Sequence, residues 1–106
     1  MNSYNKYTDL QINELVATRL KKKCLLTEES VLAYMDSGYR TFDPCNNPTD
    51  AMPIIIENKI GLSPMYHSNK WTADCLDYDF ISVNKNPLRA AMELFLMMKD
   101  AENEKV

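Results

Sequence analysis

The chain has 106 residues, 45% of them hydrophobic and 25% charged, a composition that indicates one globular domain and excludes a disordered chain. Its net charge of −3 argues against a nucleic-acid-binding protein, because such proteins usually carry a basic surplus that neutralises phosphates. No apolar run reaches the roughly 18 residues that a membrane-spanning helix needs, so no membrane association is expected.

The first predicted element is a helix that follows a short polar segment. Residues 1–7 are predicted to form a flexible arm, and residues 8–100 the single folded domain. Thr8 is a preferred N-cap residue, and Gln11, three residues later, completes a capping box. We therefore predict a helix that begins after Thr8 and ends near Lys22. The apolar positions that follow the cap at helical spacing are Ile12, Leu15, Val16 and Leu20.

The segment 27–42 is compatible with two structures. Thr27 followed by two glutamates is typical of a helix N-terminus, and a glycine lies where that helix would end. The alternative is a β-hairpin with strands over 31–34 and 39–42, joined by a short turn. We favour the helix, because the apolar residues within 31–35 fit helical spacing.

The middle of the chain is predicted to form a loop and then β-strands. Residues 43–53 hold three prolines and two asparagines without a regular period, which predicts an ordered loop. The β-branched residues that follow, within 53–62, predict a strand. Residues 71–75 and 78–83 are predicted to be further strands. The links between these strands are short, and this forces antiparallel pairing.

Residues 86–99 carry the strongest helical pattern in the chain. Asn86 is a preferred N-cap residue, and Pro87 suits the first helical position, where its missing N–H needs no partner. Apolar residues occupy more than one face of this helix, so most of its surface must be covered. The polar positions that break the apolar surface are Arg89, Glu93 and Asp100.

These elements predict an α+β fold. A small antiparallel sheet of about three strands would pack against the N- and C-terminal helices in two layers. Because the last helix is so apolar, we expect a homodimer in which the helix over residues 87–99 is partly buried between subunits. Residues 101–106 are predicted to form a charged tail that frays.

Several short motifs follow one another in an order that resembles a known family. The resemblance is to the NinX-like family of small phage and prophage proteins, and it covers residues 42–98. It implies a phage or prophage origin and a place in the host bacterial cytoplasm, and it implies no reaction. The motifs are Phe42-Asp43-Pro44, Pro53-Ile54-Ile55, Ile60-x-Leu62, Trp71-Thr72-Ala73 and Asn86-Pro87-Leu88-Arg89-Ala90-Ala91-Met92.

The chain departs from the pattern of this family at two places. Asn47-Pro48 stands where the family usually has Asp followed by Trp. Met52 stands where the family usually has Gly before the sequence Pro-Ile-Ile.

Catalytic and metal-binding patterns do not emerge from the sequence. A nucleophile–base pair would need Cys45 or Cys75 beside His67, which is the single histidine, and a third group to orient its ring. His67 is interpreted instead as a turn residue, and Cys45 as the more exposed thiol. Together with Cys24 the cysteines form no CxxC pair, so neither a disulfide framework nor a zinc site is predicted. We expect a non-enzymatic protein without a cofactor or a bound metal.

The candidate partner-binding residues are polar or aromatic side chains expected at the surface. Their acidic members would lie on the solvent face of a strand and meet an Arg- or Lys-rich surface on a partner. The leading hypothesis is that the protein binds and modulates an unidentified host protein, for example as a counter-defence inhibitor. The residues are Asp74, Asp77, Asp79, Asn46, Asn47 and Trp71.

Two further hypotheses are open. A module that binds or sequesters a nucleotide signal would need a cavity holding Arg40, Tyr39 and free backbone N–H groups, since a phosphate needs donors. A nucleic-acid-associated adaptor would need the lysines at 21–23 to join Arg19 and Arg40 in one basic face.

Overall fold

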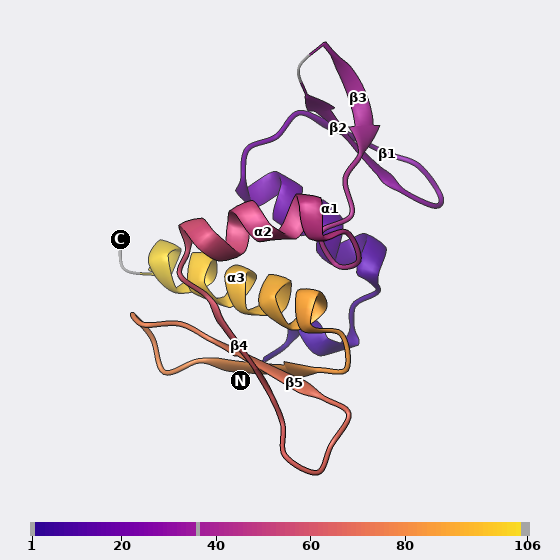
Figure 1. Ribbon diagram of the computed structural model, residues 1–106. Helices are drawn as coiled ribbons and strands as arrows, with labels where there is room; N and C mark the ends of the chain where they lie inside the picture. The colour runs from indigo at the N-terminus through magenta and orange to yellow at the C-terminus, as the bar shows by residue number, and fades with distance from the viewer. Residues whose placement is uncertain (1, 36, 105–106) are drawn as a thin grey trace.

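A layer of helices lies between two antiparallel β-sheets in the structure, a computed structural model that describes residues 2–35 and 37–104 (Figure 1). The helices are η1 (Tyr4–Lys6), α1 (Asp9–Arg19), α2 (Pro48–Glu57) and α3 (Pro87–Glu104). Sheet A consists of β1 (Cys24–Leu26), β2 (Val31–Met35) and β3 (Gly38–Thr41). Sheet B consists of β4 (Gly61–Pro64), β5 (Trp71–Asp74) and β6 (Ile81–Asn84).

The α+β class predicted from the sequence is confirmed, and each sheet has three strands. The arrangement differs from the single sheet in two layers that the sequence predicted. Sheet A packs on α1, sheet B packs on α3, and α1 and α2 both pack on α3. The second sheet comes from the segment for which the sequence favoured a helix.

The predicted helix over 27–42 is wrong, and the structure contains the alternative hairpin. β2 pairs with β3 in antiparallel register, with Tyr34 opposite Tyr39. Thr27 explains the error, because its Oγ1 accepts hydrogen bonds from the backbone N–H groups of Ser30 (2.9 Å) and Glu29 (3.3 Å). This side-chain bonding closes the turn between β1 and β2, and the same residue type would cap a helix.

The strand predicted to begin at Pro53 is also wrong, because residues 48–57 form α2. Asn47 is the N-cap, and its Oδ1 accepts from the backbone N–H of Thr49 at 3.0 Å. Pro48 occupies the first turn, where its missing N–H needs no partner. Burial of Ile54 and Ile55 against the core offsets the cost of Pro53 inside the helix. The β-branched pattern was therefore overridden by packing and capping.

The predictions for the two terminal helices are confirmed. Thr8 and Gln11 form the capping box of α1, and Asn86 Oδ1 accepts from the Leu88 N–H at 2.9 Å at the start of α3. The residues of α3 from 90 to 96 are completely buried by the rest of the same chain. The reason for expecting a partner subunit over this helix is thereby removed, although the oligomeric state itself stays a prediction.

The described residues near the two ends of the chain, 2–7 and 101–104, are more structured than the sequence predicted. Tyr4 lies in η1 and is buried, and its hydroxyl donates a hydrogen bond to Asp100 of α3. The segment predicted as a flexible arm is thus packed against the C-terminal helix. The predicted frayed tail is helical as far as Glu104, and its last two residues lie outside the described part of the chain.

Candidate functional site

A buried ionic network joins the N-terminal segment to α3. Arg89 Nε donates to Glu93 Oε2 at 2.6 Å, one helical turn further along. Arg89 Nη1 donates to Asp9 Oδ1 at 2.6 Å, and its Nη2 donates to the carbonyl oxygens of Tyr4 and Tyr7 at 3.0 and 2.7 Å. A single guanidinium therefore fixes the path of residues 4–9 over the helix.

Burial and ion pairing shift the pKa of Arg89 in opposite directions. Burial alone lowers its pKa, but the hydrogen bonds to Asp9 and Glu93 outweigh burial and raise the pKa above its ordinary value. Glu93 is completely buried, and its Oε1 accepts from Asn2 Nδ2 at 2.6 Å and from Ser82 Oγ at 3.2 Å. Arg89 and Glu93 of the polar strip predicted on α3 thus form an internal cluster, whereas Asp100 is half-exposed and pairs with Arg19. The sequence signal for the cluster was a charge pair at i,i+4 within an apolar helix.

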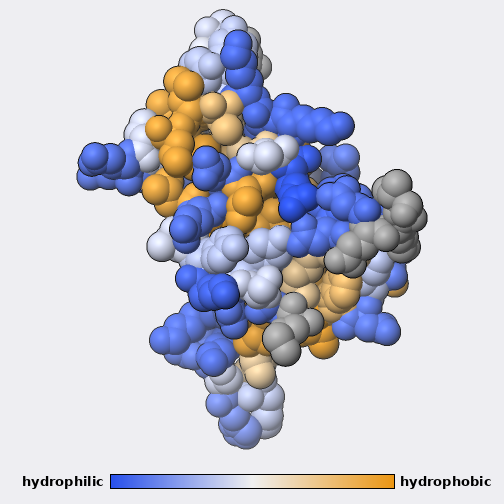
Figure 2. All heavy atoms as spheres, turned by 180° about the vertical axis from the view of Figure 1, so that it is seen from behind, coloured by the Kyte–Doolittle hydropathy of each residue, from blue (hydrophilic) through white to orange (hydrophobic). Residues whose placement is uncertain are grey.

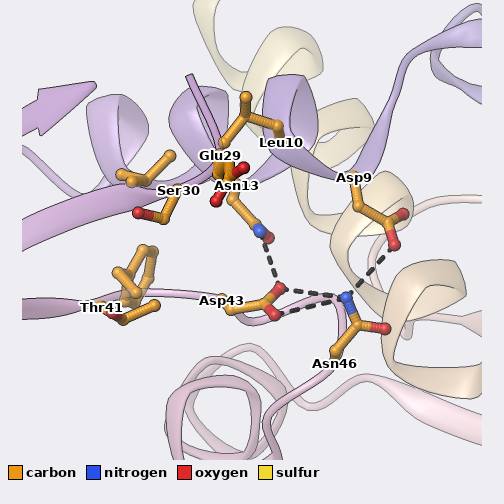
Figure 3. A pocket seen from close by; sticks show the side chains of 10 residues that line it. Asp9, Leu10, Asn13, Glu29, Ser30, Thr41, Asp43 and Asn46 are labelled. Carbon is orange, nitrogen blue, oxygen red and sulfur yellow. Dashed lines mark hydrogen bonds between the residues drawn. The ribbon is translucent and has the colours of Figure 1, made fainter. Parts of the chain in front are cut away.

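A polar cavity of about 170 Å³ lies next to this network (Figure 3). It is bounded by α1, by the turn between β1 and β2, and by the loop after β3. Asp43 Oδ1 accepts from Asn13 Nδ2 at 2.7 Å and from Asn46 Nδ2 at 3.2 Å. Asn46 Nδ2 also lies 3.2 Å from Asp9 Oδ2. These polar side chains are therefore bonded to one another, and the amides serve the fold of the loop.

Cys45 belongs to this loop, and its side chain is fully buried. This corrects the expectation that Cys45 is an exposed thiol. Its backbone N–H donates to Asn13 Oδ1 at 3.1 Å, and its carbonyl accepts from Asn86 Nδ2 at 2.6 Å. Burial, with a further contribution from the charge of Asp9, raises the pKa of the Cys45 thiol far above its ordinary value. A thiol held in its neutral form is a poor nucleophile.

The three predicted aspartates lie together in a second region, which we call the acidic hairpin, residues 74–81. Asp74 ends β5, whereas Asp77 and Asp79 lie in the loop that leads to β6, and all three are exposed. The strand predicted over 78–83 therefore begins only at Ile81, and the expected strand face is a loop. Leu76 projects from this loop with 81% of its surface exposed, and Ile81 is 58% exposed.

A hollow of about 280 Å³ beside the acidic hairpin extends its negative surface. It is lined by Leu76 and Asp77 of the loop, by Glu57 at the end of α2, and by Glu102 at the end of α3. Lys59 is the basic residue at its edge, and the basic neighbour Lys99 is paired with Glu102 at 3.3 Å. The three carboxylates of Glu57, Asp77 and Glu102 exceed the two cations of Lys59 and Lys99 by one, so the region suits a positively charged partner surface.

The profile of a phage family described as Bacteriophage P22, NinX matches residues 3–99. The chain belongs to this family. It is therefore a small phage protein, as the resemblance implied. No curated protein matches the chain.

Two of the NinX motifs meet at the polar cavity. The motif that contains Asp43 supplies the central carboxylate of the cavity. The motif that begins at Asn86 contacts the same loop, because Asn86 Nδ2 donates a hydrogen bond to the Cys45 carbonyl oxygen. The positions where this chain departs from the NinX pattern lie together at α2: Asn47 caps the helix, and Met52 is exposed on it. The motifs that contain Asp43 and Asn86 thus make folding contacts, whereas residues 75–81 of the acidic hairpin lie outside the family motifs.

The six predicted binding residues of this NinX protein fall at opposite ends of α3. Trp71 is half-buried and pairs with Asn84 just before the start of α3, close to where Asn86 Nδ2 contacts Asn46 Oδ1 at 3.2 Å. The three aspartates lie near the other end, where Asp77 and Met98 line the same hollow. The structure therefore brings the aspartates together and separates them from Asn46, Asn47 and Trp71.

A cavity of about 460 Å³ lies between sheet A and α2. Lys22 and Arg40 line it, but so do Asp50 and Glu57. Tyr39, which the ligand hypothesis also required, points to the other face of the sheet, because Ala33 opposite Arg40 faces the core. Of the two side chains that the ligand hypothesis required, Arg40 lines this cavity and Tyr39 does not.

The remaining sequence candidates are placed apart. Arg19 is paired with Asp100 at 2.7 Å, so it does not join a basic face with the neighbouring lysines. His67 lies in the loop between β4 and β5 with φ of 60° and contacts the ring of Tyr66. The Cys75 thiol lies 3.6 Å from the carbonyl oxygen of Tyr78 in the same loop, between β5 and β6.

The described residues also bear on metal and membrane binding. Within 2–35 and 37–104, no three His, Cys, Asp or Glu side chains are grouped so that they could hold a metal ion. Over the same ranges, no helix combines the length and the apolar character needed to cross a membrane.

Proposed function

We propose that this NinX-family protein is a non-enzymatic accessory protein that acts in the host bacterial cytoplasm by binding and modulating a host protein. A counter-defence inhibitor is the form of this function that we favour. The acidic hairpin is the proposed contact surface, and the observation that carries the proposal is the exposure of Leu76 among three aspartates.

Exposure of a leucine side chain costs free energy in water in proportion to the apolar area exposed. Tyr78 and Phe80 of the same loop are half-buried and stack at a centroid distance of 5.0 Å, so the loop has a fixed inner side. Leu76 is 81% exposed on its outer side. An apolar side chain surrounded by charged ones has the arrangement of an interface, with an apolar centre and a polar rim.

The charge of the region defines the partner. Asp74, Asp77 and Asp79 surround Leu76 in the sequence, and Glu57 and Glu102 line the adjoining hollow. A partner surface with an apolar pocket edged by arginine or lysine would complement both features. Such charges mainly increase the association rate and the selectivity, whereas burial of the leucine slows dissociation.

The test is capture of a protein from a bacterial host lysate at low and at moderate salt. We expect the wild-type chain to retain a stoichiometric host protein at both salt concentrations. Asp77→Lys and Leu76→Ser should each lose it, because the first reverses the charge and the second removes the anchor.

A matched control is Asn5→Lys combined with Asn69→Lys, which changes the net charge by the same two units at exposed positions elsewhere. This control should retain the captured protein. Equal capture by Asp77→Lys, or the absence of any stoichiometric protein, would contradict the proposal.

A second candidate function is small-ligand binding in the cavity between sheet A and α2. Its volume of about 460 Å³ falls within the usual range for ligand sites, and Lys22 and Arg40 line it. A nucleotide signal at about 100 times its dissociation constant should raise the unfolding free energy by about 2.7 kcal/mol. Thermal unfolding with a panel of nucleotides measures this. An unchanged melting temperature with every nucleotide rules this candidate out.

A further inference from the structure

Sheet A has an apolar face that the rest of the described chain leaves uncovered. Val31 and Ala33 of β2 point inward and are buried. Because successive strand residues point to opposite faces, Leu32 and Tyr34 of β2 point outward, as do the residues paired with them on β1 and β3. Figure 2 shows hydrophobic side chains gathered in the part of the molecule that sheet A forms. The outer face of sheet A consists of Leu25, Leu32, Tyr34, Tyr39 and Thr41.

The exposure of this face is large for so small a sheet. Leu25 is 51% exposed, Tyr34 48% and Tyr39 38%, and the two tyrosine rings meet edge to face at 5.3 Å. A contiguous exposed apolar surface on a small protein commonly marks an interface. The rings are already held in place by each other, so little side-chain freedom remains to be lost on binding.

Charges of opposite sign lie at the two ends of the outer face. The turn between β1 and β2 carries the exposed Glu28, whereas Glu29 of the same turn lines the polar cavity on the α1 side of the sheet and is not counted in this face. The opposite end of β1 carries Lys21 and Lys23, also exposed, and the Lys23 carbonyl accepts from the Tyr34 N–H at 2.8 Å. Lys22 is excluded from this set, because its amino group lies over the Phe42 ring on the inner side.

We infer that the outer face of sheet A binds a second copy of this chain in a two-fold symmetric dimer. When two copies of the sheet face each other in opposite directions, the glutamate end of one lies over the lysine end of the other. The symmetry repeats the same attraction at both ends, and the leucines and tyrosines are buried between them. A surface with this charge pattern is complementary to itself.

The inference is independent of the proposed function, because the acidic hairpin lies on sheet B and at the far side of the helical layer (Figure 1). It also replaces the helix over residues 87–99 as the dimer contact, since that helix is covered by its own chain. The partner-binding surface therefore stays open in such a dimer.

Sedimentation velocity of the full chain with three variants tests the inference. Glu28→Lys, and separately Lys21→Glu with Lys23→Glu, should each weaken the dimer by about tenfold or more, because like charges then face each other at both ends. An equimolar mixture of these two variants should restore a dimer that contains one copy of each. Tyr34→Lys should abolish association.

Two controls separate the interface from folding and from the acidic hairpin. All substituted residues are exposed or at the strand surface, so each variant should keep the wild-type circular dichroism spectrum. Asp77→Lys should remain a dimer. A wild-type chain that stays monomeric over a wide concentration range overturns the inference, and so does a dimer that none of the sheet A variants weakens. Failure of the mixture to re-form a dimer contradicts the antiparallel arrangement of the two sheets.

Discussion

Arg89 and Glu93 are the residues on which the interior most depends. Glu93 is completely buried, and Arg89 supplies its neutralising charge at 2.6 Å. The electrostatic attraction within a buried ion pair roughly balances the free energy lost when both charges leave water. Removal of one partner, however, leaves the other charge buried without compensation. The two residues should therefore behave as one unit in mutagenesis.

We predict that Arg89→Met lowers the unfolding free energy by roughly 3–5 kcal/mol. The double variant Arg89→Met with Glu93→Leu should be more stable than Arg89→Met alone, with a coupling energy of about 2 kcal/mol. Urea unfolding of the wild type, both single variants and the double variant gives this coupling. Strict additivity of the two single effects would show that the pair does not act as a unit.

Tyr4 makes stability depend on alkaline pH. Burial, together with the hydrogen bond from its hydroxyl to Asp100 and the charge of that carboxylate, raises the pKa of Tyr4 to about 12. An unfolded tyrosine has a pKa of about 10. The folded state thus holds this proton more tightly. The associated stability is complete below pH 10 and is lost as the pH rises towards 12.

The Tyr4→Phe variant should lose about 1 kcal/mol at neutral pH through the missing hydrogen bond. Because phenylalanine does not titrate, the stability difference between wild type and variant should shrink as the pH rises from 10 to 12. Urea unfolding at pH 9, 10 and 11 measures the difference. A difference that stays constant over this range would be evidence against the assigned role of Tyr4.

At the scale of elements, an asparagine followed by proline was a reliable signal for a helix start, and one of the two such pairs at a helix start was overlooked. Asn86-Pro87 predicted the start of α3, and the same pair at Asn47-Pro48 begins α2. The run of isoleucines after Pro53 suggested a strand, since β-branched residues favour strands in general. The capping pair should have carried more weight than the propensity of three residues.

The segment from Thr27 onward could not have been resolved by local chemistry. Thr27 bonds its own backbone neighbours in the turn as it would at a helix cap, so both structures use the same residue. What decides between them is the burial of Val31 and Ala33 against α1, a contact distant in the sequence. The polar cavity and the Arg89 network are likewise products of tertiary packing.

The two caps should differ in their contribution to stability. Asn47→Ala removes one cap and should cost about 1 kcal/mol. Asn86→Ala removes a cap and also the 2.6 Å bond to the Cys45 carbonyl, which then loses a buried partner. We expect roughly 2–3 kcal/mol from the sum of the two losses. Chemical denaturation of both variants tests the ranking, and equal costs would mean that the bond to Cys45 contributes nothing.

At the scale of the molecule, the chain presents different surfaces at its two sheets. The outer face of sheet A is apolar between charged ends, whereas the acidic hairpin of sheet B carries an exposed leucine among carboxylates. The helical layer between them holds the buried ionic network and keeps the surfaces apart. The proposed dimer contact and the proposed partner contact therefore use different surfaces and do not compete.

The central claim is that the acidic hairpin contacts the host partner. Hydrogen–deuterium exchange of the captured complex, compared with the free chain, measures this most directly. We predict slower exchange over residues 74–81 and at the ends of α2 and α3 that line the neighbouring hollow. Protection confined to sheet A or to residues 43–47, with residues 74–81 unchanged, would contradict the claim.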